Sequence, residues 1–206
     1  MVSPSPLDVS RAERRSRARE FTRAAILAAA RQVAAREGAA NLSLRAVAAE
    51  AGFAPAALYG YFASKSELLI ALAAEDLGSV TRSLRELRAE APVLGRAASV
   101  AIDMLRHSET MAAGAAALPS ARGMGEAERL FNGRLIAALR ALSETSGILD
   151  DSRQGQADVV LIAAALTGIA VLARSGRLQA LGFSPAELVA ALDIHFAAGT
   201  APVKAS

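Results

Sequence analysis

The sequence predicts an all-α protein of about nine helices, and three observations support this fold class. Of the 206 residues, 53% are hydrophobic but only 4% are aromatic, because alanine supplies much of the apolar content. Alanine has the highest helix propensity, and Leu, Arg and Glu follow closely. Runs of alternating β-branched residues, which are typical of half-buried strands, do not occur in the sequence, and apolar residues recur at helical spacing instead.

The residue types that build enzyme centres and metal sites are missing or isolated. There is no cysteine, which excludes disulfides and thiolate ligands. The two histidines, His107 and His195, do not have the spacing of a metal-ligand pair. The sequence contains no Gly-rich phosphate loop and no visible pairing of a nucleophile with a base. We therefore expect no cofactor and no enzymatic activity, the alternative being a catalytic site that is assembled only in the folded chain.

The sequence also predicts where the protein resides. The first twenty residues are basic but contain no apolar stretch, so they do not resemble a secretory signal. The longest apolar run, Val159–Ala173, is bounded by Asp158 and Arg174 and is short for a bilayer span. We expect this run to form a buried helix, and we expect the protein to be cytoplasmic with no membrane partner.

Positive charge is concentrated at the N-terminal end. Residues 1–65 hold ten Lys and Arg against five acidic residues, whereas residues 66–206 hold thirteen against fifteen. This asymmetry indicates a polyanion-binding N-terminal part. Residues 1–18 are expected to form a disordered basic arm. Two interpretations of its arginines stay open: a solvated tail or helix start, or an arm that lies against phosphates or enters a minor groove.

The first two predicted helices lie within residues 19–50. Apolar residues recur at helical spacing over Arg19–Arg36, and Gly38 follows as a stop signal. Ser43 is a candidate N-cap for a short helix over Leu44–Glu50. Gly52 closes that helix, because glycine readily adopts the left-handed conformation.

A third predicted helix completes a helix-turn-helix pattern. Pro55 suits the first position of a helix, which is expected to run to Phe62. Ser64 and Glu67 have the spacing of a capping box at the start of the next helix. Two short helices around a glycine turn are typical of a helix-turn-helix, although an ordinary helical hairpin has the same spacing.

The remainder of the chain is predicted to be helical as well. A long helix over Ser66–Ala89 is ended by Pro92 and Gly95. Further helices are predicted at 97–112, 125–146, 155–175 and 185–198. No internal repeat and no long linker are visible, so the long helix is expected to join the N-terminal unit rigidly to the rest.

The segment from Ser43 to Leu69 resembles the DNA-binding segment of TetR-family transcriptional repressors. The residues that match are Val47-Ala48, Ala51-Gly52, Leu58-Tyr59, Phe62, Lys65 and Leu68. The spacing Leu-Tyr-x-x-Phe-x-x-Lys is highly specific, and the similarity covers about residues 20–70. The resemblance implies a helix-turn-helix DNA-binding domain over 19–65, joined to a helical ligand-binding and dimerisation domain over 66–206.

The aromatic cluster of this segment has two expected roles. Leu58 and Phe62 are four residues apart, so they share the inner face of the third helix. The hydroxyls of Tyr59 and Tyr61, the only tyrosines of the chain, can reach phosphate oxygens. The charge of Lys65 adds to the positive end of the following helix, where a backbone phosphate would fit.

By resemblance, the third helix is the recognition helix that enters the major groove. The residues at the family's DNA-contact positions are Ser43, Arg45, Ala54, Pro55, Ala56, Ala57, Tyr59, Gly60, Tyr61 and Lys65. The recognition helix carries no Gln, Asn, Arg or Lys, so its direct readout is expected to be mostly apolar, such as alanine against thymine methyls. We hypothesise that Arg45 supplies the main guanine contact; a phosphate contact or a solvated surface arginine are the alternatives.

The resemblance implies a homodimer through the two C-terminal helices and an effector pocket in the helical body. Small apolar residues on the first of these helices offer a close packing surface: Ala157, Val160, Ala164, Thr167, Gly168 and Val171. An apolar stripe on the second consists of Leu188, Ala191, Leu192, His195 and Phe196. The candidate ligand-binding residues are Asp103, Met104, His107, Met111, Phe131, Asn132 and Leu135, with Leu139 beside them. These residues suit an ordinary core equally well.

The function expected from the resemblance is that of a ligand-responsive repressor. As a dimer it would bind a palindromic DNA operator, and a small apolar effector of unknown identity would release it. The alternative is a DNA-binding regulator without a small effector, or one that activates transcription or requires a corepressor.

Overall fold

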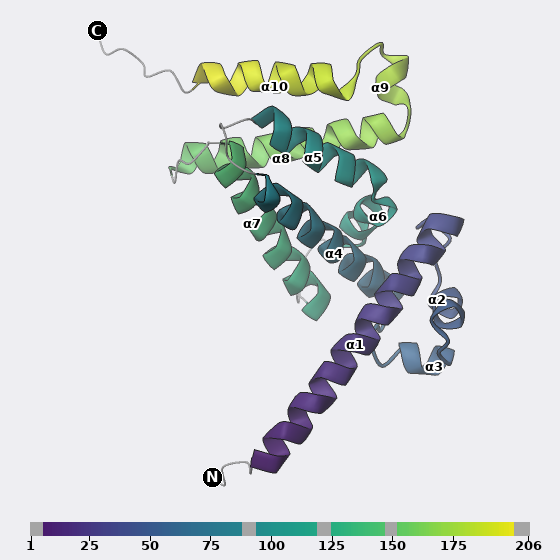
Figure 1. Ribbon diagram of the computed structural model, residues 1–206. Helices are drawn as coiled ribbons and strands as arrows, with labels where there is room; N and C mark the ends of the chain where they lie inside the picture. Colours follow the sequence, from purple (N-terminus) through teal and green to yellow (C-terminus); the bar gives the residue numbers. More distant parts are fainter. Residues whose placement is uncertain (1–5, 88–93, 119–124, 147–151, 200–206) are drawn as a thin grey trace.

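The computed structural model describes residues 6–87, 94–118, 125–146 and 152–199, and their regular structure is entirely helical (Figure 1). Within these ranges the chain forms ten helices, α1 to α10, where about nine were expected. The predicted all-α fold class is therefore confirmed.

The N-terminal unit has the predicted turn and cap. Its three helices are α1 (Pro6–Glu37), α2 (Leu44–Ala51) and α3 (Pro55–Leu58). The Ser43 hydroxyl oxygen accepts a hydrogen bond from the Ala46 amide at 3.2 Å and so caps α2. Gly52 has a φ of 73°, the left-handed conformation that closes this helix.

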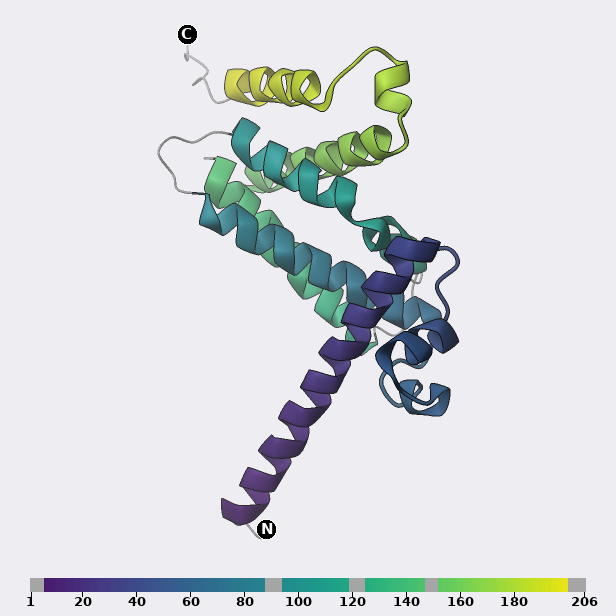
Figure 2. The same ribbon diagram turned by 45° about the vertical axis from the view of Figure 1, so that its right-hand side comes forward.

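The first helix is longer than expected. Residues 6–18, which were expected to form a disordered arm, are the first turns of α1, and these turns project past the rest of the described chain (Figures 1 and 2). The expectation was wrong because this segment contains four arginines and two alanines, which are strong helix formers. Pro6 stands at the first helical position, which proline tolerates.

The third helix is shorter than expected, since α3 ends at Leu58 rather than at Phe62. The chain nevertheless stays wound beyond that point. The Gly60 amide donates to the Ala57 carbonyl at 3.2 Å, and the Phe62 amide donates to the Leu58 carbonyl at 2.9 Å. Glycine is a poor helix former, and tight turns around Gly60 replace the last predicted helical turn.

Leu58 and Phe62 anchor the N-terminal unit, as predicted. Both side chains are fully buried, and they belong to a hydrophobic core that includes Val33 of α1 and Val47 of α2. Leu68 brings the beginning of the next helix, α4 (Lys65–Glu86), into the same core. The short helices are thus held by burial of large side chains, each of which contributes about 1.5–3 kcal/mol.

The predicted capping box starts α4. The Ser64 hydroxyl oxygen accepts from the Glu67 amide at 3.1 Å, and the Glu67 carboxylate accepts from the Ala63 amide at 2.7 Å. The return bond therefore goes to the residue before the cap, rather than to the cap itself.

The body is built around α4. Its remaining helices are α5 (Leu94–His107), α6 (Glu109–Ala117), α7 (Glu126–Ser146), α8 (Arg153–Arg174), α9 (Arg177–Ala180) and α10 (Pro185–Gly199). Helix α4 packs along α6 and α7, while α5 packs against α8 and α10 (Figure 2).

The expected helix over 97–112 is divided into α5 and α6. Ser108 lies between the two helices, and its hydroxyl oxygen accepts from the Met111 amide at 3.1 Å. This bond caps α6 in the manner of a helix N-terminus. The periodicity of apolar residues could not reveal the division, because it continues across Ser108.

One face of α8 is exposed, although the sequence predicted a buried helix. By length and composition α8 could cross a membrane, with a mean hydropathy of 2.0 over its most apolar stretch, of which 28% is buried. Core helices of soluble proteins satisfy the same criterion. Val159, Ile162 and Leu166 face the interior, whereas Val160 and Leu161 are more than half exposed. The helix therefore has a buried face and an exposed apolar face.

Candidate DNA-binding motif and ligand cavity

The predicted DNA-contact residues lie on α2, α3 and the adjoining turns, and most of them are exposed. Ala54, Pro55, Ala56 and Ala57 present a small apolar surface at the start of α3. Tyr59, at the end of α3, is 60% exposed. Because α3 turns its only large side chain inward, its outer surface can approach another molecule closely.

Ser43 and Arg45 are exposed at the beginning of α2. The Ser43 oxygen already caps the helix, but its hydroxyl proton can still be donated. Arg45 makes no hydrogen bond or ion pair with any described residue. Its guanidinium is therefore available to an external partner.

Lys65 and Tyr61 are engaged within the protein. The Lys65 ammonium donates to the Ala40 carbonyl at 2.6 Å, which ties the loop before α2 to the start of α4. An ammonium has three donors, so two remain for a phosphate. Tyr61 is half-buried against the core, and the Arg19 guanidinium lies 5.5 Å from the centre of its ring. Of the two tyrosines, only Tyr59 is largely exposed.

Two arginines of α1 contact the end of the helix-turn-helix, and sequence reasoning did not assign them this role. The Arg19 guanidinium donates to the Gly60 carbonyl at 3.1 Å. The Arg23 guanidinium lies 4.7 Å from the centre of the Phe62 ring, a cation–π distance. Their four-residue spacing, which puts both on one helix face, was the available signal.

The family of this motif is decided by a sequence comparison. Residues 26–72, which run from α1 through α2 and α3 into α4, match the profile described as "Bacterial regulatory proteins, tetR family". This chain is similar to the TetR family over these residues. It is a transcriptional regulator with a helix-turn-helix DNA-binding domain. No curated protein matches the sequence.

Solved structures share the fold of this chain over most of its length. A TetR transcriptional regulator from Rhodococcus sp. RHA1 is 20% identical, with 93% of this chain and 100% of that chain covered and a TM-score of 0.67. A protein with unknown function from Rhodococcus sp. RHA1 is 26% identical, with 86% and 94% covered and a TM-score of 0.63. FadR from Bacillus subtilis, in complex with stearoyl-CoA, is 19% identical, with 82% and 94% covered and a TM-score of 0.52.

The helical body of the chain contains an apolar cavity of about 180 Å³ between α4, α5, α6, α7 and α8. Of the predicted ligand-binding residues, Met111, Phe131 and Leu135 line it, together with Leu139. Among the described residues that line it, Thr167 alone has a polar side chain, and its hydroxyl donates to the Ala163 carbonyl at 2.8 Å. A molecule inside the cavity would therefore contact almost only apolar side chains.

The other predicted ligand-binding residues lie elsewhere. Asp103 and Met104 line a second cavity of about 360 Å³, which is polar and borders α1, α4 and α5. Asn132 is on α7 and lines neither cavity. The side chain of His107 lies outside the described residues. Sequence reasoning thus overestimated the polar contribution to the apolar cavity.

Sequence reasoning expected the pocket beside the long helix, now α4, but it named none of the lining residues of that helix. Leu77, Val80 and Leu84 line it from α4, and Leu166 lines it from α8. All four are buried apolar residues at helical spacing, a pattern that does not distinguish a cavity wall from a filled core.

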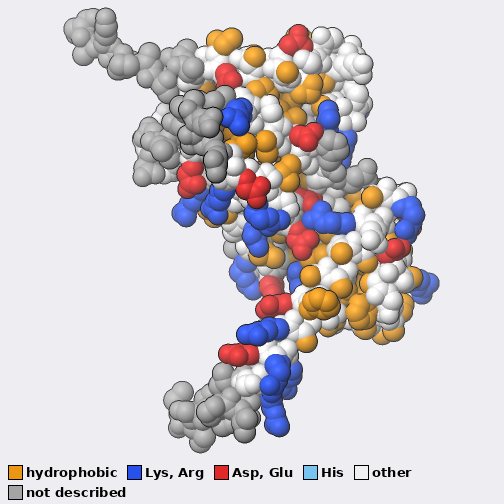
Figure 3. Space-filling model, in the orientation of Figure 1, with side chains coloured by type: hydrophobic (Ala, Val, Ile, Leu, Met, Phe, Trp, Pro, Cys, Tyr) orange, Lys and Arg blue, Asp and Glu red, His pale blue; other side chains and the backbone are white. Residues whose placement is uncertain are grey.

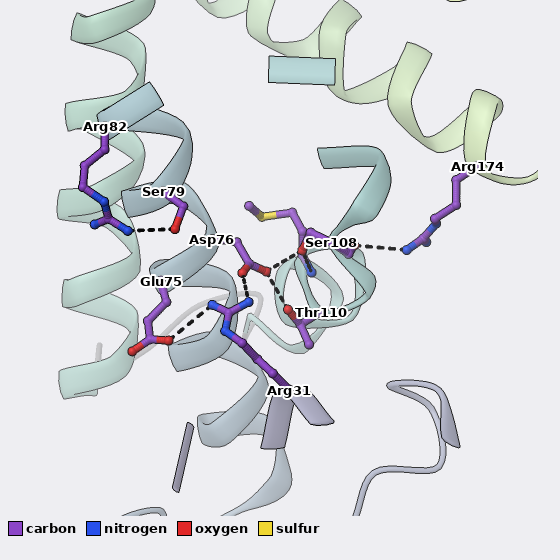
Figure 4. Close-up of polar contacts among 9 residues, drawn as sticks. Arg31, Glu75, Asp76, Ser79, Arg82, Ser108, Thr110 and Arg174 are labelled. Carbon is purple, nitrogen blue, oxygen red and sulfur yellow. Dashed lines mark hydrogen bonds and ion pairs between the residues drawn. The ribbon is translucent and has the colours of Figure 1, made fainter. Parts of the chain in front are cut away.

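A buried carboxylate joins the cavity region to the DNA-binding domain (Figure 4). Asp76 of α4 is 7% exposed and accepts hydrogen bonds from Arg31 of α1 and from Ser108. The Thr110 hydroxyl of α6 donates to the same carboxylate at 2.5 Å. The Arg31 guanidinium also donates to Glu75 at 3.2 Å. We call these five residues the Asp76 cluster.

The charge of Arg31 is fixed by its partners. Burial lowers the pKa of the guanidinium, but the charge and hydrogen bond of Asp76, followed by those of Glu75, raise the pKa above its usual value overall. Arg174, at the end of α8, donates to the Ser108 carbonyl at 3.1 Å. Helices α1, α4, α6 and α8 therefore meet at one set of polar contacts (Figure 4).

Proposed function

We propose that this TetR-family regulator is a repressor that binds a palindromic operator as a homodimer and is released by a small apolar effector. The observation that carries this proposal is the apolar cavity, whose walls continue into the Asp76 cluster and hence into α1. The protein would act in the cytoplasm as a regulator rather than as an enzyme. Residues 19–65 would form its DNA-binding domain, and residues 66–206 its ligand-binding and dimerisation domain.

DNA recognition would combine a close apolar approach with a few polar contacts. The exposed Ala56 and Ala57 suit contact with thymine methyl groups in the major groove. The free guanidinium of Arg45 suits a bidentate contact with guanine, and the exposed Tyr59 hydroxyl suits a phosphate. Lys65 would contribute a phosphate contact with the donors that Ala40 leaves unused.

The homodimer would be formed mainly by the exposed face of α8. Its predicted surface residues are all exposed: Ala157, Val160, Ala164, Thr167, Gly168 and Val171. Small side chains let two helices approach closely, and the exposed apolar area is of the kind that marks a protein interface. Helix α10 contributes less than predicted, because Leu188, Leu192 and Phe196 are partly buried against the core of their own chain.

The cavity defines the chemical class of the effector. A cavity of about 150 Å³ lined by apolar side chains accepts a benzene-sized molecule, and the cavity here is of similar volume. An uncharged molecule with a single ring or a short alkyl chain fits this description. A charged group would be left without a partner inside it, which is energetically unfavourable.

The effector signal would reach the DNA-binding domain through the Asp76 cluster. Leu105 and Met111 line the cavity on either side of the junction that holds Ser108 and Thr110. A ligand that displaces this junction would alter the contacts of Asp76, and hence the position of α1. Since effector binding favours one of two conformations, the spacing of the two recognition helices would change.

The test starts with duplexes selected by the wild-type protein from a random DNA pool. A panel of uncharged aromatic and short alkyl compounds is then added to the complex, and anisotropy of the labelled duplex is followed. Release supports the proposal. Tightened binding would favour a corepressor mechanism, and no response to the panel would favour a regulator without a small effector.

A cavity-filling variant shows where an active compound binds. The compound should raise the melting temperature of the wild-type protein, because it binds the folded state. Ala138→Leu, which fills the cavity wall, should lose this rise, whereas Ala116→Leu on the exposed side of α6 should keep it. An equal rise in both variants would place the compound outside the cavity.

A further inference from the structure

The first half of α1 carries a row of arginines, and none of them forms an ion pair with a described residue. Arg11, Arg15, Arg19 and Arg23 are spaced four residues apart and follow one face of the helix. From Arg11 to Arg23 there are six arginines and two glutamates. Figure 3 shows the basic side chains gathered along the projecting part of the helix.

The row continues the face of α1 that packs on the DNA-binding domain. One helical step beyond Arg23, the same row reaches Leu27, which is 2% exposed in the core. Arg23 and Arg19 are held at Phe62 and Gly60, at the end of the recognition motif. Arg15 and Arg11 are the next members of the row, and both lie on the part of α1 that projects past the rest of the described chain.

The two outer arginines keep their charged groups unpaired among the described residues. Arg15 donates only to the Arg11 carbonyl, at 3.4 Å, and Arg11 makes no side-chain contact. Glu20 accepts a hydrogen bond from Ser16 at 3.2 Å, and neither Glu13 nor Glu20 forms an ion pair with an arginine of the row among the described residues. The face of α1 that packs on the helix-turn-helix therefore becomes strongly basic at Arg15 and Arg11, beyond that contact.

We propose that Arg11 and Arg15 bind the phosphate backbone of duplex DNA beside the half-site that α3 reads. This inference rests on the proposed operator binding and extends it to flanking DNA. DNA is the partner that three features favour: the positive charge of the row, its continuity with the recognition motif and the overhang of α1. Residues 6–18 extend α1 by about 20 Å at 1.5 Å per residue, or about six base pairs of DNA.

Because residues 6–18 are helical, we expect them to contact the phosphate backbone of DNA rather than to enter its minor groove. An α-helix with its side chains is about 10–12 Å wide, whereas the minor groove is about 6 Å wide. A flexible arm could enter that groove, but α1 cannot. The contacts are therefore independent of base sequence, and they increase affinity more than specificity.

Two duplexes of different length test this inference. A palindrome selected from a random pool is prepared without flanks and with about ten extra base pairs on each side, which is longer than the six or so that the helix overhang spans. Wild-type protein should bind the longer duplex roughly tenfold more tightly, with a salt slope steeper by about 2–4 for two arginines in each of two chains. The Arg11→Gln, Arg15→Gln double variant should lose both gains.

A matched control removes the same charge from the same helix. Arg14 and Arg17 are exposed on other sides of α1, so the Arg14→Gln, Arg17→Gln variant should keep most of the length gain. If both double variants lost the same part of the length gain, the gain would depend only on net charge, and the inference would be overturned. An undiminished length gain in Arg11→Gln, Arg15→Gln would also overturn it. Failure of the wild-type protein to bind either duplex would instead contradict the proposed function.

Discussion

At the scale of single residues, local signals predicted the caps and anchors of the DNA-binding domain, but not its long-range contacts. Ser43 and Gly52 act on neighbours close in sequence, and the four-residue spacing of Leu58 and Phe62 put both on the buried face, so residue type and spacing were sufficient. The Asp76 cluster joins residues that are 34 and 45 positions apart. No periodicity in the sequence relates Arg31, Asp76 and Thr110, and only the packing of three helices brings them together.

Arg45 is expected to read one base pair. Because its guanidinium is exposed and unpaired among the described residues, Arg45→Ala should weaken operator binding by about 1–3 kcal/mol and relax specificity at one position. Binding to a set of singly substituted operators measures both effects. Arg85→Ala, on the exposed side of α4, is the control. Uniform weakening on every duplex would show that Arg45 contacts only phosphate.

Asp76 is expected to stabilise the fold more than its neighbour Glu75. Asp76→Asn leaves Arg31, Ser108 and Thr110 facing an amide with only one acceptor, so unfolding in urea should show a loss of about 1–3 kcal/mol. Glu75→Gln, which breaks a half-exposed ion pair, should cost less than about 1 kcal/mol. Equal losses in the two variants would contradict the central place of Asp76 in the cluster.

At the scale of elements, helix positions were predictable while several boundaries and contacts were not. Apolar spacing located α4, α7, α8 and α10 within a few residues. It missed the division at Ser108 and the early end of α3, where a hydroxyl and a glycine alter the backbone locally. The residues of the cavity wall on α4 were not named for another reason: burial of leucines shows that a helix packs, but not how completely its neighbours fill the space.

The close approach of α6 to α4 depends on Gly114. A Cβ atom added there would lie 2.5 Å from the Ala73 Cβ and 2.6 Å from the Leu69 carbonyl oxygen. Gly114→Ala should therefore separate the helices and destabilise the protein by about 1–3 kcal/mol in urea unfolding. Gly133→Ala on α7, where a Cβ meets nothing within 4 Å, should leave stability unchanged or raise it by up to about 1 kcal/mol. Similar effects of both changes would contradict this packing.

The N-terminus of α10 is expected to weaken in acid. Hydrogen bonds from the Ser184 hydroxyl and amide, both at 2.7 Å, lower the pKa of Glu187 below its usual value. Since the folded pKa is the lower one, this cap stabilises the helix above the unfolded pKa and is lost as pH falls through the folded pKa. The protection factors of the α10 amides, which compare their hydrogen exchange with the intrinsic rate at each pH, should therefore fall over that acidic range. Glu187→Gln should remove the pH dependence, and an unchanged profile would show that the cap does not stabilise α10.

At the scale of the whole molecule, the exposed apolar face of α8 accounts for the proposed homodimer. Helical periodicity predicted that Val160, Ala164 and Gly168 share a face, and the structure leaves that face uncovered within the described chain. A single chain presents one recognition helix and few base contacts, so a two-fold partner is needed to read a palindrome. Dimerisation and operator affinity should therefore be lost together.

Ala164→Glu places a charge on this face and should convert the dimer to a monomer in sedimentation velocity. Operator affinity should fall at least about a hundredfold, because each half-site is then bound independently. Gln32→Glu on the exposed side of α1 makes the same change in charge away from α8 and should leave a dimer. A dimeric Ala164→Glu variant with full affinity would place the interface elsewhere.

The most direct measurement of the whole account is the mass of the wild-type protein bound to a duplex that it has selected, followed from low to high salt. The account predicts two chains on each palindrome and an affinity that falls steeply as salt is added. A protein that remains a single chain and shows no salt-sensitive affinity for double-stranded DNA would contradict it.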